Sequence, residues 1–181
     1  MSMDLLASLP KLLDARPEAD TTGLRRDLFV APEHIVEAAR RLLLAEFHLE
    51  DISGMDTAEA ILVTYHFNHF DRDERTALRV ITPHDHPGVP SIAAIYGGAE
   101  WHEREVSDFF GVVFHNNPNP APLLLAEAGV VTPLLKSEKK RISIREVIRP
   151  GRIEYRDPGF TLFGAEPVSD IGATQPKEAQ T

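Results

Sequence analysis

Two neighbouring runs of strand-type residues, joined by a short charged turn, constrain the fold of this chain most. In residues 60–70 an apolar side chain stands at every second position from Ile61 to Phe67. Residues 76–82 follow the turn at 71–74 with a second strand-like run. Such a pattern is typical of a hairpin in a sheet that has one buried face. The chain is therefore predicted to contain a sheet that other elements must cover.

Helical periodicity marks three segments around this hairpin. Residues 4–15 carry leucines at helical spacing, and Pro32 can open a second helix because the first turn does not need its missing N–H. A third helix is expected over 99–110, where Gly111 is suited to end it. Further strands are predicted at 27–30, at 49–55 with Gly54 as a bulge or break, and at 112–114. The predicted class is α+β with two layers, in which helices pack on a mixed or antiparallel sheet of about four to five strands.

Composition argues against several classes of function. The net charge of −9 argues against free nucleic-acid binding, which needs a basic surface. The sequence contains no cysteine, which excludes disulfides and cysteine-held iron–sulfur clusters within the chain. No apolar run approaches the ~18 residues that a membrane span needs, and the acidic N-terminus is unlike a secretory signal. We expect a soluble, cytoplasmic protein that can still sit on a membrane complex through a partner.

After residue 116 prolines become frequent and periodicity is mostly lost. We predict an α+β domain over residues 1–116 and an extended tail over 117–181, with a disordered end. From Lys136 to Arg156, eight basic residues against three acidic ones give a net charge of +5. The tail is predicted to dock on a partner, either an acidic protein or anionic lipid headgroups, although a solvated basic stretch is the plainer alternative. The predicted docking residues are Lys139, Lys140, Arg141, Arg145 and Arg149.

The segment over 100–114 has the sequence E-W-H-E-R-E-V-S-D-F-F-G-V-V-F. As a helix it has an apolar face that is predicted to pack on the sheet. Glu100, Arg104 and Asp108 follow one turn apart on the opposite face and can form two successive ion pairs. Trp101 projects from the same polar side, and an exposed indole among charges is typical of protein interfaces. A salt-bridged surface that faces solvent is the plainer alternative.

This segment resembles the hallmark of the 30 kDa family of complex I and its hydrogenase relatives, E-R-E-x-x-D-x-(F/L)-G-(I/V)-x-F. The motif is long and specific, Val112 also fits it, and the resemblance extends over residues 25–116. Trp101 sits where the family places an aromatic residue. The family signature, which is also the predicted partner interface, comprises Trp101, Glu103, Arg104, Glu105, Asp108, Phe110, Gly111 and Phe114.

The resemblance implies a non-catalytic structural or assembly subunit in the peripheral arm of a complex I-like NADH:quinone oxidoreductase. Such a protein binds a large subunit of the 49 kDa type, together with a small iron–sulfur subunit. It holds no cofactor itself, so that NADH and quinone, or nickel–iron, and the iron–sulfur centres are expected in partner subunits. The expected location is peripheral, on the cytoplasmic side of the cell inner membrane.

Two alternatives remain open. The family usually continues with a His-Pro-Asp-Leu-Arg-Arg-Ile-Leu-like stretch, whereas residues 117–124 are Asn-Pro-Asn-Pro-Ala-Pro-Leu-Leu. This departure makes the equivalent subunit of an energy-converting membrane-bound nickel–iron hydrogenase or formate hydrogenlyase the first alternative. The second is a free-standing metal hydrolase in which His84 and His86 bind an ion with a third ligand such as His102 or Glu103.

Overall fold

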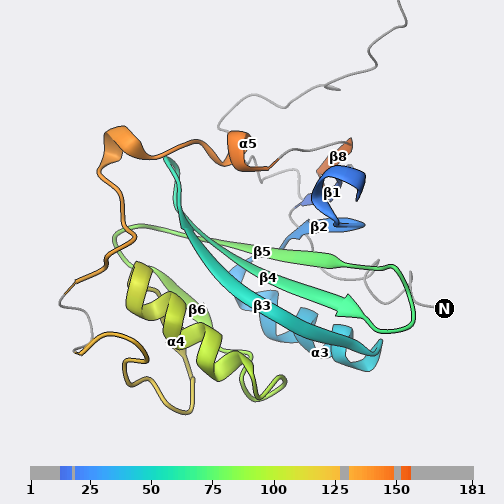
Figure 1. Cartoon of the computed structure of the whole chain (residues 1–181), viewed down its shortest axis with the longest axis horizontal. Coiled ribbons are helices and arrows are strands. Elements are labelled where there is room, and N and C mark those ends of the chain that lie inside the picture. Colours follow the sequence, from blue (N-terminus) through green and yellow to red (C-terminus); the bar gives the residue numbers. More distant parts are fainter. Residues whose placement is uncertain (1–12, 18, 127–130, 149–151, 156–181) are drawn as a thin grey trace, which may run out of the picture.

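The computed structural model describes residues 13–17, 19–126, 131–148 and 152–155. Within these residues the chain forms a six-stranded mixed sheet, a two-stranded ribbon and several helices (Figure 1). The strands are β1 (Leu13–Arg16), β2 (Arg26–Phe29), β3 (Phe47–Asp56), β4 (Ile61–His69), β5 (Thr76–Thr82), β6 (Gly88–Pro90), β7 (Val113–His115) and β8 (Arg152–Tyr155). The α-helices are α2 (Ala19–Thr22), α3 (Ile35–Leu44), α4 (Ala99–Phe110) and α5 (Ile144–Val147), and the 3₁₀-helices are η1 (Pro32–His34) and η2 (Glu138–Lys140). The predicted α+β class is confirmed.

The predicted hairpin forms β4 and β5, and β4 pairs antiparallel with both β3 and β5. β3 pairs through Gly54, which lies opposite Val63, and its register shifts instead between Leu49 and Asp51. The prediction of a bulge at Gly54 is therefore wrong. The glycine is needed for another reason, because a Cβ at this position would lie 2.5 Å from the ring of Phe110.

The strand order is β3-β4-β5-β2-β1-β8, and among the described strands of this sheet only β2 and β5 pair in parallel. The sheet exceeds the predicted four to five strands because β1 and β8 extend it beyond β2. Residues 13–15 were predicted as the end of a helix, and this part of the prediction is wrong. Leu13 and Ala15 are buried in a cluster with Phe29, and pairing with β2 and β8 supplies backbone partners that a local pattern cannot reveal. The remainder of the predicted helix, 4–12, lies outside the described residues.

The larger hydrophobic core lies between the sheet and the helices α3 and α4. It combines one side of α3, the inner side of α4 and alternate residues of β4, as the periodicity predicts. The main contributors from these three elements are Ile35, Ala38, Ala39, Leu42, Ile61, Val63, Tyr65, Phe67, Val106 and Phe110. The short parallel pair β6–β7 flanks α4 and adds Val89 and Phe114 to the same core.

A second, smaller core covers the opposite face of the sheet. Phe29 and Leu62 point away from α3 and α4, and the tail residues Ile144 and Ile148 bury them. In Figure 1 the chain after β7 passes beside α4, reaches η2 and then crosses to α5 and β8. The described part of the predicted tail is thus extended, but it lies along the domain, and Ile144 and Ile148 are buried without a partner protein.

Candidate functional site

Glu103 lies in the first half of α4 with a fully buried side chain. Its Oε2 accepts hydrogen bonds from Ser91 Oγ at 2.6 Å and Asn117 Nδ2 at 2.7 Å, and its Oε1 accepts one from the Ile92 N–H at 2.8 Å. Burial raises the pKa of Glu103, although these three donors oppose the shift. The signature glutamate therefore joins the turn after β6 to the loop after β7.

Arg104 and Asp108, one turn apart on α4, both bind the chain segment that follows β7. Arg104 Nε donates to the Ala121 carbonyl at 2.8 Å, and Nη2 donates to the Pro122 carbonyl at 2.9 Å. Asp108 Oδ2 accepts the backbone N–H groups of residues 123–125 at 3.0, 2.7 and 3.0 Å. Burial alone raises the pKa of Asp108, but the three amides and the nearby arginine outweigh it and lower the pKa below its usual value.

These contacts revise the expected ion pairs on α4. Arg104 Nη1 lies 3.8 Å from Glu100 Oε1, so the first predicted pair is present. The described side chains of Arg104 and Asp108 form no direct ion pair, because both are directed to residues 121–125. Two residues that were predicted to face a partner thus hold the chain's own tail against the helix.

Trp101 and Glu105 are the exposed members of the signature. Trp101 is 59% exposed, and the Arg104 guanidinium carbon lies 5.3 Å from the centroid of its ring. The other members are buried or end the helix: Phe110 and Phe114 lie in the core, and Gly111 adopts φ 73° after α4. Of the eight signature residues, Trp101 and Glu105 are thus the two whose side chains are exposed in the described structure.

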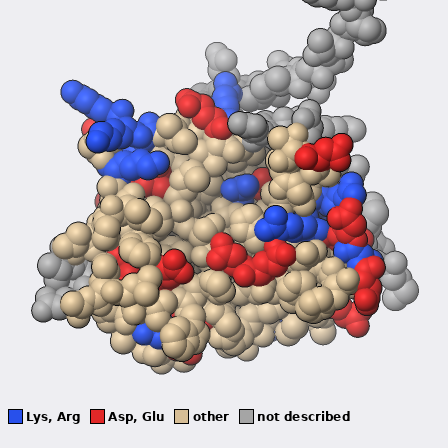
Figure 2. All heavy atoms as spheres, viewed as in Figure 1, with Lys and Arg blue, Asp and Glu red and all other residues tan. Residues whose placement is uncertain are grey.

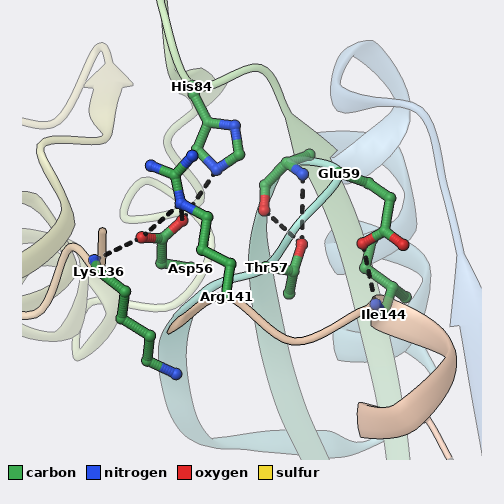
Figure 3. Close-up of polar contacts among 8 residues, drawn as sticks. Asp56, Thr57, Glu59, His84, Lys136, Arg141 and Ile144 are labelled. Carbon is green, nitrogen blue, oxygen red and sulfur yellow. Dashed lines mark hydrogen bonds and ion pairs between the residues drawn. The ribbon is translucent and has the colours of Figure 1, made fainter. Parts of the chain in front are cut away.

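A second polar centre surrounds Asp56 at the end of β3, where three chain segments meet (Figure 3). The Asp56 side chain is fully buried, and His84 Nε2 lies 2.8 Å from its Oδ1. Oδ2 accepts the Lys136 backbone N–H at 2.6 Å, and Arg141 Nε lies 2.9 Å from Oδ1. Burial alone raises the pKa of Asp56, but the Lys136 amide, His84 and Arg141 outweigh it and lower the pKa below its usual value.

Glu59, in the turn between β3 and β4, anchors the next part of the tail (Figure 3). Its Oε1 accepts a hydrogen bond from Ser143 Oγ at 2.5 Å, and its Oε2 accepts the Ile144 N–H at 2.9 Å. The Ala58 N–H donates to the Ile142 carbonyl at 2.9 Å. Asp56 and Glu59 together fix residues 136–144 at the turn between β3 and β4. Neither carboxylate was predicted from the sequence. The one signal that the sequence carries for them is a pair of acids at a strand end, in a chain with a basic tail.

The predicted docking residues of the tail separate into different roles. Arg141 is mostly buried against Asp56 and therefore stabilises the fold. Lys139 and Lys140 are exposed on η2, and Arg145 is exposed on α5. Arg149 lies outside the described residues. Figure 2 shows blue side chains gathered at the upper left of this view, over η2.

The loop of His84, Asp85 and His86 does not gather metal ligands. His84 turns to Asp56, whereas His86 is largely exposed with Nδ1 3.2 Å from Asp85. His102, a candidate third ligand, pairs with Asp51 at 3.3 Å. Within the described ranges no group of three or more His, Asp or Glu side chains is placed to hold a metal ion.

The helices of the described part are also too short or too polar to cross a bilayer.

One protein family matches most of the folded chain. A sequence model described as "Respiratory-chain NADH dehydrogenase, 30 Kd subunit" matches residues 28–141. These residues run from β2 through η2 to Arg141, so the match includes Glu103, Arg104, Asp108 and Asp56 with the residues that they bind, but it ends before Ser143 and Ile144.

Individual proteins are also similar to this chain. The C subunit of the NADH-quinone oxidoreductase of Roseiflexus sp. (strain RS-1) is 34% identical over 147 residues, which cover 75% of this chain and 84% of that protein. The C/D subunit of the NADH-quinone oxidoreductase of Methylococcus capsulatus (strain Bath) is 35% identical over 89 residues, 49% of this chain but 15% of its own length. A chain in the structure of the membrane-bound sulfane sulfur reductase (MBS), an archaeal respiratory membrane complex, aligns with a TM-score of 0.54 and 26% identity, covering 63% of this chain and 68% of that one.

Proposed function

Because the chain belongs to the family of the 30 kDa subunit of respiratory-chain NADH dehydrogenase, we propose that it is a structural subunit that binds a 49 kDa-type large subunit. In this role it supports electron transfer to quinone by holding its partner in the peripheral arm of a complex I-like oxidoreductase. The observation that carries the proposal is the relative named as a C/D subunit, in which this chain matches 15% of the length. The name C/D joins two subunits, and that protein is much longer than this chain. Both are expected where a C-type chain is fused to a larger subunit that it contacts.

The redox centres of the complex are assigned to other subunits in this proposal. The chain has no cysteine to hold an iron–sulfur cluster, and its two buried carboxylate centres are occupied by contacts within the chain. NADH, quinone and the iron–sulfur centres belong to the large subunit and to a small iron–sulfur subunit. In this proposal the complex lies at the cytoplasmic side of the inner membrane, and this chain is one of its peripheral subunits.

Co-purification with a large subunit tests the proposal. We expect the full-length tagged chain, purified from detergent-solubilised membranes, to carry the large subunit with it. Trp101→Ala should weaken binding of the large subunit about 30-fold and lower its recovery accordingly, because tryptophans at interfaces often contribute ~2 kcal/mol or more to binding. Phe70→Ala is the matched control, since Phe70 is 81% exposed in the turn region after β4.

Thermal unfolding of the isolated variants distinguishes lost binding from lost folding. Both Trp101→Ala and Phe70→Ala should unfold at the same temperature as the unaltered chain, since neither side chain belongs to the core. Recovery of the unaltered chain without a large subunit would reject the proposal.

A related setting is the equivalent subunit of a membrane-bound complex that does not oxidise NADH, such as an energy-converting hydrogenase. The structural similarity to a chain of the membrane-bound sulfane sulfur reductase favours this setting, as does the divergent sequence over residues 117–124. Metal analysis and NADH oxidation by the purified complex separate the two. Nickel without NADH oxidation would select the hydrogenase type, whereas NADH oxidation without nickel would select the complex I type.

A further inference from the structure

Residues 131–142 present apolar and basic side chains side by side at the end of α4. We call this the tail surface. Its exposed apolar members are Val131, Leu134, Leu135 and Ile142, and its exposed basic members are Lys136, Lys139 and Lys140. Four of the ten large apolar side chains that are exposed in the described residues fall within these twelve positions, and apolar exposure that is gathered in one place marks contact sites. The composition of the tail surface therefore points to a contact.

The backbone of the tail surface is fixed at several points before any partner arrives. The Leu134 N–H donates to the Phe109 carbonyl at 3.2 Å, and the Lys136 N–H donates to Asp56 at 2.6 Å. Arg141 pairs with the same aspartate, as Figure 3 shows. A surface held in this way loses little conformational entropy when a partner binds.

The charge of the tail surface is opposite to that of the whole chain. Arg141 is neutralised by Asp56, and Glu138 is the one acid within residues 131–142. Among the described residues no carboxylate forms an ion pair with Lys139 or Lys140. The net charge of the chain is −9, so this corner is a positive region on an acidic protein, as the blue spheres over η2 in Figure 2 illustrate. Such a region attracts a negatively charged partner.

We propose that the tail surface docks an acidic segment of the large subunit that also carries apolar side chains. This inference rests on the proposed function and adds the chemistry of the partner's contact. Apolar contacts with Leu134 and Leu135 supply affinity, and the lysines steer and orient the acidic segment. A lipid surface fits less well, because η2 spans three residues and offers no amphipathic helix to lie in a membrane interface.

Lys140→Glu tests the charge requirement, with Arg40→Glu as the matched control. Arg40 is exposed on α3, which lies at the lower right of Figure 1, whereas η2 lies at the upper left, and both substitutions change the net charge equally. The tagged chains are co-expressed with the rest of the complex and purified in ~0.1 M and ~0.5 M salt, since salt screens exposed charges. We expect Lys140→Glu to recover about tenfold less large subunit at low salt and to depend less on salt, whereas Arg40→Glu should match the unaltered chain.

Three outcomes decide the inference. Equal recovery with Lys140→Glu and Arg40→Glu would overturn it while leaving the proposed function intact, because the unaltered chain would still bind the large subunit. Absence of the large subunit from the unaltered chain would instead reject the proposed function and this inference together. Binding to phosphatidylglycerol vesicles that Lys140→Glu abolishes, with large-subunit recovery unchanged, would assign the tail surface to lipid. An unchanged unfolding temperature shows that Lys140→Glu leaves the fold intact.

Discussion

Gly54 of β3 lies directly against the ring of Phe110 on α4, and a side chain at this position would collide with the ring. We expect Gly54→Ala to lower the free energy of unfolding by about 1–3 kcal/mol, the usual range for overpacking a core. Denaturant titration of the isolated chain measures this loss. Gly97→Ala is the control, since nothing lies within 4 Å of a Cβ at Gly97. An equal loss in both variants would contradict the steric explanation.

Asp56 should make the stability of the chain sensitive to acid. Its pKa is lowered in the folded state, so its contribution is fully present above the ordinary carboxyl pKa of about 3.9 and is lost as pH falls through the lower folded pKa. Asp56→Asn should lower the free energy of unfolding at pH 7 by about 3 kcal/mol, because it leaves the mostly buried Arg141 guanidinium without its counterion.

Urea titrations at neutral and acidic pH check this expectation. The free energy of unfolding of the unaltered chain should fall toward that of Asp56→Asn as Asp56 becomes protonated. Asp85→Asn is the control, because Asp85 is exposed in the loop after β5 and pairs with His86, which is also exposed. A similar loss of stability from Asp85→Asn would show that the Asp56 centre is not the cause.

At the scale of elements, the short helix α5 closes one face of the sheet. Ile144→Ala should destabilise the chain by about 2–4 kcal/mol, because Ile144 is fully buried in the smaller core and its truncation leaves a cavity. Ile142→Ala offers a matched control two residues earlier, where the side chain is 40% exposed and the loss should stay below about 1 kcal/mol. Chemical denaturation of both variants tests the difference, and indistinguishable values would show that α5 does not seal this face.

The elements that the sequence predicts well are those with local patterns. The hairpin, α3 and α4 appear where periodicity, Pro32 and Gly111 place them. By contrast, β1 takes its partners from β2 and from β8 near the other end of the chain, and such pairing leaves no local signal. The same limit applies to the candidate site. The motif identifies Arg104 and Asp108, but only the fold shows that they bind the tail.

At the scale of the whole molecule, the tail and the domain form a single folded unit in the described residues. The sequence predicts that a chain without residues 136–181 loses docking but keeps its core. The structure leads to a different expectation, because this deletion removes α5 and β8 and uncovers Phe29 and Leu62.

We expect a chain that ends at residue 135 to unfold about 10 °C below the full chain, since losing two buried isoleucines corresponds to roughly 4 kcal/mol. Calorimetry of the two chains measures the shift. A chain that ends at residue 155 is the control, since it retains β8 and the covering helix and should unfold near the temperature of the full chain. Equal unfolding temperatures for the short and full chains would support an independent domain.

The covering of the second sheet face by a late segment also sets an order for biosynthesis. A chain emerging from the ribosome can assemble the strands from β2 to β5 and then α4, but Phe29 and Leu62 stay in contact with water until α5 has been translated. Exposed apolar surface on a nascent chain invites aggregation and chaperone binding. Docking of Ile144 and Ile148, and not completion of the strands, therefore removes this exposed surface.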